Sequence, residues 1–278
     1  HEASRARPTR PLPAPPTPPP PCCTATGPAG AAGGANITVA VNCVTNTFAI
    51  SVTVSGLAGS GLVLQNNSGN NLAISVGGTY PFTTQIASGA AYSVTVLTQP
   101  SAPTQTCTVA NPSGTVGGGD VNLTVSCVAN TYTISVTVSG LAGTGLVLRN
   151  NGGNNLAIPN DGTFNFTTLI ASGAGYNVTV FTQPATPTQT CTVPNPSGTV
   201  VGANVTVAVG CVTNTYTIGG SITGLLGTGL VLQNNSGNNL TVAANATSFT
   251  FSTPIASGQN YAVTVLTQPS TPTQTCVV

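Results

Sequence analysis

The chain has 278 residues, of which only 3% are charged: four arginines, no lysine and three carboxylates, besides one histidine. A globular chain is normally about one quarter charged. Acid-base catalysis, metal-assisted chemistry and calcium binding all need clustered ionisable side chains that this composition does not supply. A net charge of +1 is also too small to attract nucleic acid. We therefore expect a protein that is not an enzyme, has no cofactor or metal and does not bind nucleic acid.

The first 21 residues form a proline-rich tail with nine prolines between Pro8 and Pro21. Proline has no backbone donor for a sheet and favours polyproline II, so residues 1–21 are expected to be a polyproline II spacer or a disordered leader. The chain opens on His1 rather than Met, which indicates a processed or cut N-terminus. No apolar run approaches the roughly 18 residues of a spanning helix, so we expect no membrane insertion.

An 84-residue repeat organises the rest of the chain. The segment 43–47 (CVTNT) recurs as 127–131 (CVANT) and 211–215 (CVTNT). A unit of this size can hold a core of its own, unlike the roughly 20–50 residue units of solenoids. The pattern predicts a spare closing hairpin followed by three tandem domains, at residues 22–43, 44–127, 128–211 and 212–278.

Within each repeat, apolar residues alternate with polar ones at a period of two, which is typical of half-buried strands. In the first repeat the apolar set is Phe48, Ile50, Val52 and Val54. Gly, Asn-Asn and Pro clusters interrupt these runs about every 8 to 12 residues, the spacing of a sandwich. We expect an all-β chain, a tandem array of three immunoglobulin-like antiparallel β-sandwiches with about six or seven strands each.

Comparison of the repeats indicates that the three charged residues beyond the tail have no functional role. They are Asp120, Arg149 and Asp161. Each stands where the sister repeats carry neutral residues: Asn36 and Asn204, Gln65 and Gln233, and Gly77 and Asn245, respectively. We therefore expect solvent-facing substitutions rather than a ligand-binding or catalytic site.

Three strings carry a resemblance to a known class of proteins: residues 61–67 (GLVLQNN), 86–92 (IASGAAY) and 106–111 (TCTVAN). They resemble the tandem extracellular Ig-like repeats of surface and adhesin-like proteins of Gram-negative bacteria, over about residues 23–278. The resemblance implies export to the cell surface and a structural or adhesive role, and it transfers no active site.

Eight cysteines in an exported β-rich chain indicate disulfides. The favoured scheme closes local hairpins, with Cys107 joined to Cys127 and Cys191 to Cys211, because hairpin register alone brings these ends together. A rival scheme joins the ends of each domain and stays open here: Cys43 to Cys107, Cys127 to Cys191 and Cys211 to Cys276.

The two ends of the chain match each other. Cys23 and Cys43 have the 20-residue spacing of the two hairpins, and residues 36–43 (NITVAVNC) closely copy 204–211 (NVTVAVGC). The third repeat stops at Val278, where its sisters continue for about twenty residues. These observations predict donation of a strand, with Ile37, Val39 and Val41 entering the third repeat of another copy, and an open head-to-tail homopolymer.

Local pairing of Cys23 with Cys43 leaves Cys22 and Cys276 as candidates for an interchain disulfide. A vicinal Cys22–Cys23 bond is the less favoured alternative, because consecutive Cα atoms lie about 3.8 Å apart. The leading prediction is a structural subunit of an extracellular bacterial filament. The alternatives are an adhesin or surface stalk that binds through loops such as residues 66–71, and an array that simply begins and ends within a domain. The sequence identifies no receptor.

Overall fold

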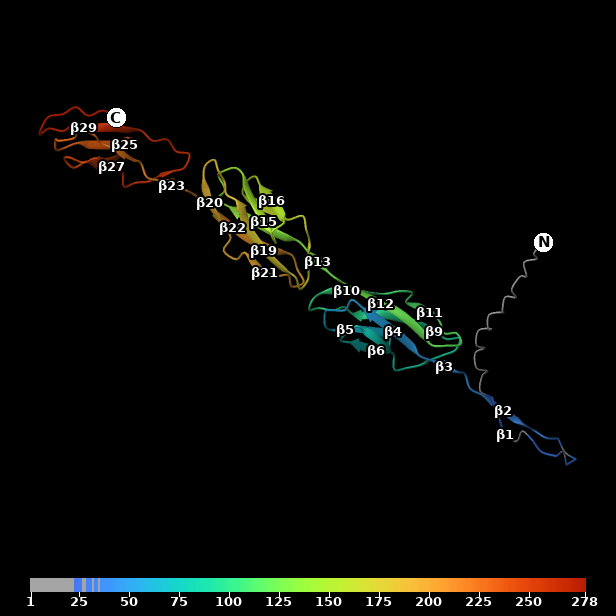
Figure 1. Ribbon diagram of the computed structural model, residues 1–278. Coiled ribbons are helices and arrows are strands. Elements are labelled where there is room, and N and C mark those ends of the chain that lie inside the picture. The colour runs from blue at the N-terminus through green and yellow to red at the C-terminus, as the bar shows by residue number, and fades with distance from the viewer. Residues whose placement is uncertain (1–22, 27–28, 32, 35) are drawn as a thin grey trace, which may run out of the picture. The chain divides into compact units, whose positions relative to one another are not determined.

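The computed structural model describes residues 23–26, 29–31, 33–34 and 36–278, and only the backbone of residues 23–26. The proline-rich tail and Cys22 lie outside this part of the chain. All regular structure in the described part is β-strand, as the arrows in Figure 1 show. No described segment forms a helix with the length and apolarity needed to cross a bilayer. The chain divides into two compact units, residues 1–130 and 131–278.

An antiparallel hairpin precedes the first repeat, formed by β1 (Cys23–Thr26) and β2 (Ala40–Cys43). The backbone register places Cys23 opposite Cys43 and Thr26 opposite Ala40. Every residue of β2 is exposed, so one face of the hairpin packs on nothing in the described structure.

The first repeat is a two-sheet sandwich. Its strands are β3 (Thr47–Phe48), β4 (Ile50–Ser55), β5 (Leu62–Asn66), β6 (Asn70–Ile74), β7 (Gly78–Pro81), β8 (Ile86–Ala87), β9 (Ala91–Thr98), β10 (Gln105–Val109), β11 (Ser113–Thr115) and β12 (Val121–Ala129). One sheet has the order β10-β12-β4-β7 and the other β11-β9-β5-β6, while β3 pairs with β8.

The second repeat has the same arrangement. Its strands are β13 (Thr131–Tyr132), β14 (Ile134–Ser139), β15 (Leu146–Asn150), β16 (Asn154–Ile158), β17 (Gly162–Asn165), β18 (Ile170–Ala171), β19 (Gly175–Thr182), β20 (Gln189–Thr192), β21 (Ser197–Thr199) and β22 (Val205–Thr213). The sheets run β17-β14-β22-β20 and β16-β15-β19-β21.

The third repeat has fewer strands. They are β23 (Thr215–Tyr216), β24 (Gly219–Ser221), β25 (Val231–Asn234), β26 (Asn238–Thr241), β27 (Ser248–Thr250), β28 (Ile255–Ala256) and β29 (Val263–Thr267). Its sheets are the pair β24-β27 and the three-stranded β26-β25-β29, while β23 pairs with β28.

The period-two pattern produces the cores. Along β4, Ile50 and Val52 are completely buried and Val54 is 3% exposed, while Ser51 and Thr53 between them are half-buried. Successive side chains of a strand point to opposite faces, so each apolar alternate meets the facing sheet. Each repeat has a separate core of this kind. The predicted fold class, three tandem Ig-like β-sandwiches, is confirmed.

One pair of strands in each of the first two repeats is parallel. The closing strand β12 lies alongside β4 with Val121 opposite Ile50 and Val125 opposite Val54, and β22 lies alongside β14 in the same way. The other pairings in these repeats are antiparallel. In the first two repeats the first long strand and the closing strand therefore lie side by side, and the closing strand completes the sheet.

A buried glutamine fastens the loop after the first long strand. Gln105 is 3% exposed, and its Oε1 accepts hydrogen bonds from the backbone N–H groups of Ala58 and Gly59 at 2.8 and 2.7 Å. Its Nε2 donates to the carbonyl of Gly56 at 2.8 Å. Buried polar atoms without partners are costly, so this amide fixes the loop against the strand that carries it.

Candidate functional site

The third repeat has an open edge where its sisters have their closing strand. In the second repeat, β14 pairs with β17 on one side and with β22 on the other. Among the described residues, its counterpart β24 pairs with β27 alone. The backbone N–H and C=O groups on the other edge of β24 are therefore available to another strand.

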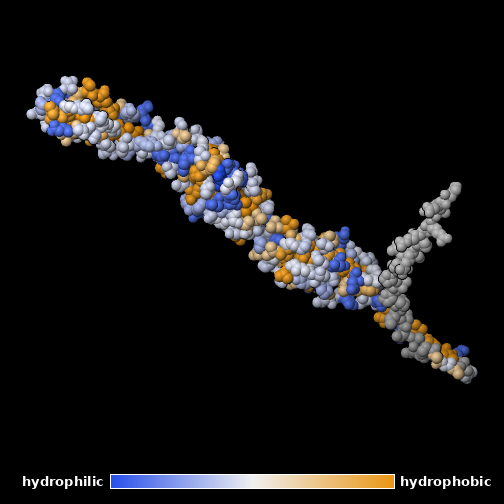
Figure 2. All heavy atoms as spheres, viewed as in Figure 1, coloured by the Kyte–Doolittle hydropathy of each residue, from blue (hydrophilic) through white to orange (hydrophobic). Residues whose placement is uncertain are grey.

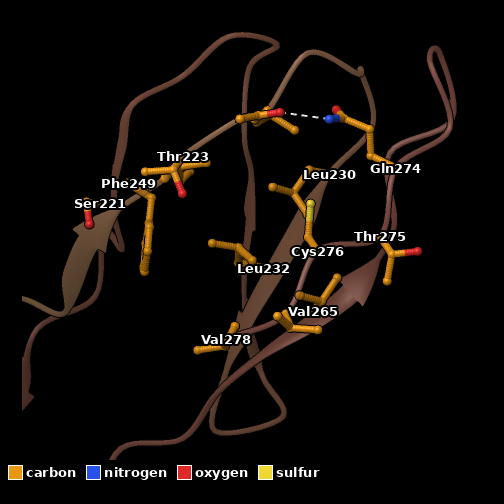
Figure 3. A pocket seen from close by; sticks show the side chains of 14 residues that line it. Ser221, Thr223, Leu230, Leu232, Phe249, Val265, Gln274, Thr275, Cys276 and Val278 are labelled. Atoms are coloured by element: carbon orange, nitrogen blue, oxygen red, sulfur yellow. Dashed lines mark hydrogen bonds between the residues drawn. The ribbon is translucent and has the colours of Figure 1, made fainter.

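A groove of about 310 Å³ lies along this open edge. Figure 3 shows its walls: Phe249 and Ser221 stand on one flank, Val265 and Cys276 on the other, and Leu232 lies between them. The complete lining is Ser221, Ile222, Thr223, Gly224, Leu225, Leu230, Leu232, Phe249, Val265, Gln274, Thr275, Cys276, Val277 and Val278. Most of the side chains that line the groove are apolar, and backbone polar groups are available along the open edge of β24, a combination that suits an extended peptide.

Burial in the third repeat shows what the groove lacks. Ile218, Ile222 and Val263 are only half-buried. The residues at these positions in the first two repeats are at most 3% exposed: Ile50, Val54, Val94, Ile134, Val138 and Val178. In Figure 2, residues of the hydrophobic colour reach the surface of all three repeats and of the described part of the N-terminal hairpin. The exposed apolar side chains near the two ends of the described chain include Ile37, Val41, Val277 and Val278.

One wall of the groove, the Gln274–Val278 segment, has the same hydrogen bonds as its counterpart in the first repeat, which has its closing strand. Gln274 makes the bonds of Gln105, accepting from the N–H groups of Leu226 and Gly227 at 2.8 and 2.7 Å and donating to the Gly224 carbonyl at 2.7 Å. The dashed line in Figure 3 marks the last of these. The Gln274–Val278 segment is therefore held in the position of β10 before any strand lies beside it.

A glycine marks the vacant place of the closing strand. A Cβ on Gly56 would collide with the carbonyl oxygen of Cys127, and a Cβ on Gly140 would collide with that of Cys211. All three glycines have a φ between 72° and 77°, including Gly224 at the same position of the third repeat. A Cβ on Gly224 would meet nothing within 4 Å. The space that a cysteine carbonyl fills in both sister repeats is empty here.

The groove lacks a closing strand, whereas the predicted donor residues are apolar side chains that are not buried in any core of the described structure. Ile37, Val39 and Val41 are 61%, 46% and 61% exposed. In the first repeat the corresponding residues are Val121, which is half-buried, Leu123 at 6% and Val125 at 0%. These predicted donor residues are therefore exposed where their counterparts in the first repeat are covered.

At two further positions, which the sequence comparison did not single out, the segment before the first repeat carries a residue that suits the third repeat. A Cβ on Gly114 would lie 2.6 Å from the hydroxyl of Tyr92, so the ring of this tyrosine covers the glycine of β11. The corresponding tyrosine of the third repeat, Tyr261, is 64% exposed, and Gly30 stands 84 residues before Gly114. The available signal was the Ser-Gly-Thr string at residues 113–115 and 197–199, whose counterpart at residues 29–31 is Ala-Gly-Ala.

The second of these positions holds an Asn or Asp whose side-chain oxygen fixes the start of the closing strand. Asn204 Oδ1 accepts a hydrogen bond from the N–H of Thr133 at 2.9 Å, and Asp120 does the same for Ala49 at 2.8 Å. Asn36 occupies this position before the first repeat and is exposed.

The remaining charges also have structural partners. Arg149 Nε donates to Asn155 Oδ1 at 2.8 Å, as the Gln65 amide donates to Asn71 at 2.7 Å, and the guanidinium lies 3.4 Å from the Phe181 ring centroid. Asp161 accepts from the N–H groups of Gly140 and Leu141, which begin the loop after β14, at 3.0 and 2.7 Å. Within the described residues, no three His, Cys, Asp or Glu side chains lie close enough together to hold a metal ion.

Two disulfides join the closing strands to their neighbours, Cys107 to Cys127 and Cys191 to Cys211, each with a Cα–Cα distance of 4.0 Å. Cys43 is an exposed free thiol, and Cys276 is a half-buried free thiol. The side chains of Cys22 and Cys23 lie outside the described residues, so the pairings predicted for them stay predictions.

No protein-family model matches the chain, and no curated protein matches it. The chain is similar in structure to the Bacillus anthracis TIE protein, with a TM-score of 0.46 and 13% identity over 83% of this chain and 47% of that one. It is also similar to a streptococcal ancillary pilin (TM-score 0.23, 10% identity, 84% of this chain and 93% of that one). A third similar structure is the shaft pilin spaA from Lactobacillus rhamnosus GG (0.19, 10%, 62% and 99%).

The chain spans about half the length of the first of these proteins. The Gram-negative origin that the sequence resemblance implied has no support among them.

Proposed function

We propose that this chain is a structural subunit of an extracellular fibre, and that it polymerises head to tail when residues 29–43 of one subunit enter the groove of the third repeat of the next. Two observations carry the proposal: a groove lined mainly by apolar side chains lies at the open edge of β24, and the exposed strand β2 has a sequence that matches the closing strands of the first two repeats. Strand addition to a free sheet edge supplies backbone hydrogen bonds for affinity and side-chain pockets for specificity.

A second copy of this chain is the occupant that fits best, because its residues match the site at several independent points. Ile37, Val39 and Val41 have the spacing of the buried alternates of a closing strand. Asn36 would accept from the N–H of Thr217, as Asn204 accepts from Thr133 in the second repeat. Each match fixes the same register, and a slip by one residue would turn every apolar side chain to solvent.

Apolar burial favours this association. Fully burying a Val or Ile side chain contributes roughly 1.5–3 kcal/mol, and the three donor residues, which are already about half covered, together gain roughly 2–4 kcal/mol. The backbone hydrogen bonds along β24 and the Gln274–Val278 segment add to this, against the entropy lost on association. Because these donor residues are exposed in the free subunit, their burial is gained only on assembly.

The arrangement of donor and acceptor determines the form of the assembly. The donor lies before the first repeat and the acceptor lies in the third, so the contact is heterologous, and repeated heterologous contacts propagate as an open filament. Near-zero net charge opposes association only weakly. The two disulfides suit an oxidising location outside the cytosol. An open fibre of β-sandwiches at the cell surface is a structural role that requires no catalytic group.

Electron microscopy of the purified chain tests the proposal. The intact chain should form long uniform fibres, and so should a variant lacking residues 1–21, which keeps the whole hairpin. A variant lacking residues 1–43 loses the donor and should remain monomeric by sedimentation, with an open third repeat. Fibres formed equally by this last variant would refute strand donation, and monomeric rods from the intact chain would favour a surface stalk.

A further inference from the structure

We propose that the docked strand is locked by an interchain disulfide between Cys43 of the donor and Cys276 of the acceptor. The inference rests on the proposed function and adds a covalent step to it. It differs from the pairing of Cys22 with Cys276 that the spacing of the cysteines suggests.

The completed repeats provide the geometry. Cys107 on β10 lies directly opposite Cys127 on the closing strand, and the two are bonded; Cys191 and Cys211 have the same relation. Cys276 stands at the first position of this pair in the third repeat, where the second position has no occupant among the described residues. Cys43 stands 84 residues before Cys127 and so occupies the second position of the donor.

Cys276 is held ready for this partner. Its N–H donates to Gln268 Oε1 at 2.8 Å, and its carbonyl accepts from Gln268 Nε2 at 2.9 Å. Cys107 makes the same two bonds with Gln99, at 2.7 and 3.0 Å. The backbone of Cys276 thus already has the position of a bonded cysteine. Its thiol lines the groove beside Leu230, as Figure 3 shows.

Docking of the donor strand changes the cysteine that lies opposite Cys43. A closing strand uses both edges, since β12 lies between β10 and β4. A donor β2 seated between the Gln274–Val278 segment and β24 therefore has no free edge for its own β1. Assembly replaces β1 with the acceptor segment, and Cys276 takes the place opposite Cys43 that Cys23 has in the free hairpin.

The bond forms by oxidation of two thiols. The S–H bonds of Cys43 and Cys276 break, one S–S bond forms, and two electrons and two protons pass to a low-molecular-weight disulfide, which is reduced to two thiols. Such oxidants are typical of the compartments where structural disulfides persist. A subunit that is bonded in this way cannot leave the fibre when the free subunit concentration falls.

The test uses full-length chains assembled with oxidised glutathione and analysed by non-reducing electrophoresis and electron microscopy. The intact chain should give fibres and a covalent ladder that collapses on reduction. Cys43→Ser and Cys276→Ser should each abolish the ladder and keep the fibres, because strand docking does not require the bond. Matched controls Cys22→Ser and Cys23→Ser should keep both. Proteolytic mapping of the ladder should recover a peptide linking Cys43 to Cys276.

The possible outcomes distinguish the proposed Cys43–Cys276 disulfide from the proposed assembly by strand donation. Fibres whose ladder maps to Cys22 or Cys23, or fibres that give no ladder, would overturn the lock and leave strand donation standing. A complete lack of fibres from the intact chain would overturn the proposed function, and the lock with it.

Discussion

Truncation of one donor side chain, Val41→Ala, should weaken fibre assembly without affecting the free subunit. In the completed repeats this position is held by Val125 and Val209, which are 0% and 1% exposed, whereas Val41 itself is 61% exposed. Removing two buried carbon groups costs about 1.6 kcal/mol by transfer, or about 2 kcal/mol with the cavity that remains. Because each 1.4 kcal/mol is tenfold in affinity, the dissociation constant should rise about 30-fold.

The measurement is the critical concentration for assembly, obtained by pelleting fibres over a series of total concentrations under reducing conditions. Asn42→Ala is the matched control, because the corresponding residue Ser126 faces away from the core and is exposed. The control should leave the critical concentration unchanged within about twofold. Equal critical concentrations for both variants would refute the claim that Val41 enters a core. Unchanged circular dichroism of each unassembled subunit excludes an effect on folding.

Two other substitutions test the register and the fold. Gly30→Val should block assembly, since a side chain there would collide with the ring of Tyr261. Gly33→Val should not, because the second repeat carries an exposed valine at that position; equal pelleting of both variants would place the register elsewhere. Gln189→Leu should lower the unfolding free energy of the second repeat by about 3 kcal/mol, since it leaves two loop N–H groups unpaired. Gln233→Leu, at a half-exposed position, should cost less than 1 kcal/mol, and similar costs in calorimetry would contradict the anchoring role.

The sequence predicted the faces of the strands because alternation encodes them directly. Ile134, Val136 and Val138 alternate with polar residues and are at most 2% exposed. Alternation does not encode which strand lies alongside, or in which direction. The parallel pairing of β14 with β22 joins strands that lie about seventy residues apart in the sequence. No hairpin connects them directly, so no local turn in the sequence predicts this pairing.

Buried polar side chains were not predicted for a related reason. Gln105 and Asn66 are 3% and 1% exposed, yet amides are usually exposed, and apolar alternation gives them no weight. The recurrence of Thr-Gln-Thr-Cys in every repeat was the one signal available. For the candidate site, the similarity between residues 36–43 and 204–211 led to the prediction of a donor strand, which stays a prediction. The roles that we propose for Gly30 and Cys43 could be inferred only from the contacts of their counterparts in the other repeats.

The strand that we propose as the acceptor, β24, differs in sequence from its counterparts in the first two repeats. Where the first two repeats have a fully buried valine, Val52 or Val136, the third has Gly220, and a Cβ there would lie 3.0 Å from the ring of Phe249. That ring packs edge-on against Phe251, which is completely buried. Glycine weakens the interior of a strand, and an unpaired edge strand can pair with other chains. The Phe249 ring fills the space that a valine side chain would need at Gly220, so in the proposed assembly the core of the third repeat would be closed on this side while the groove awaits a donor.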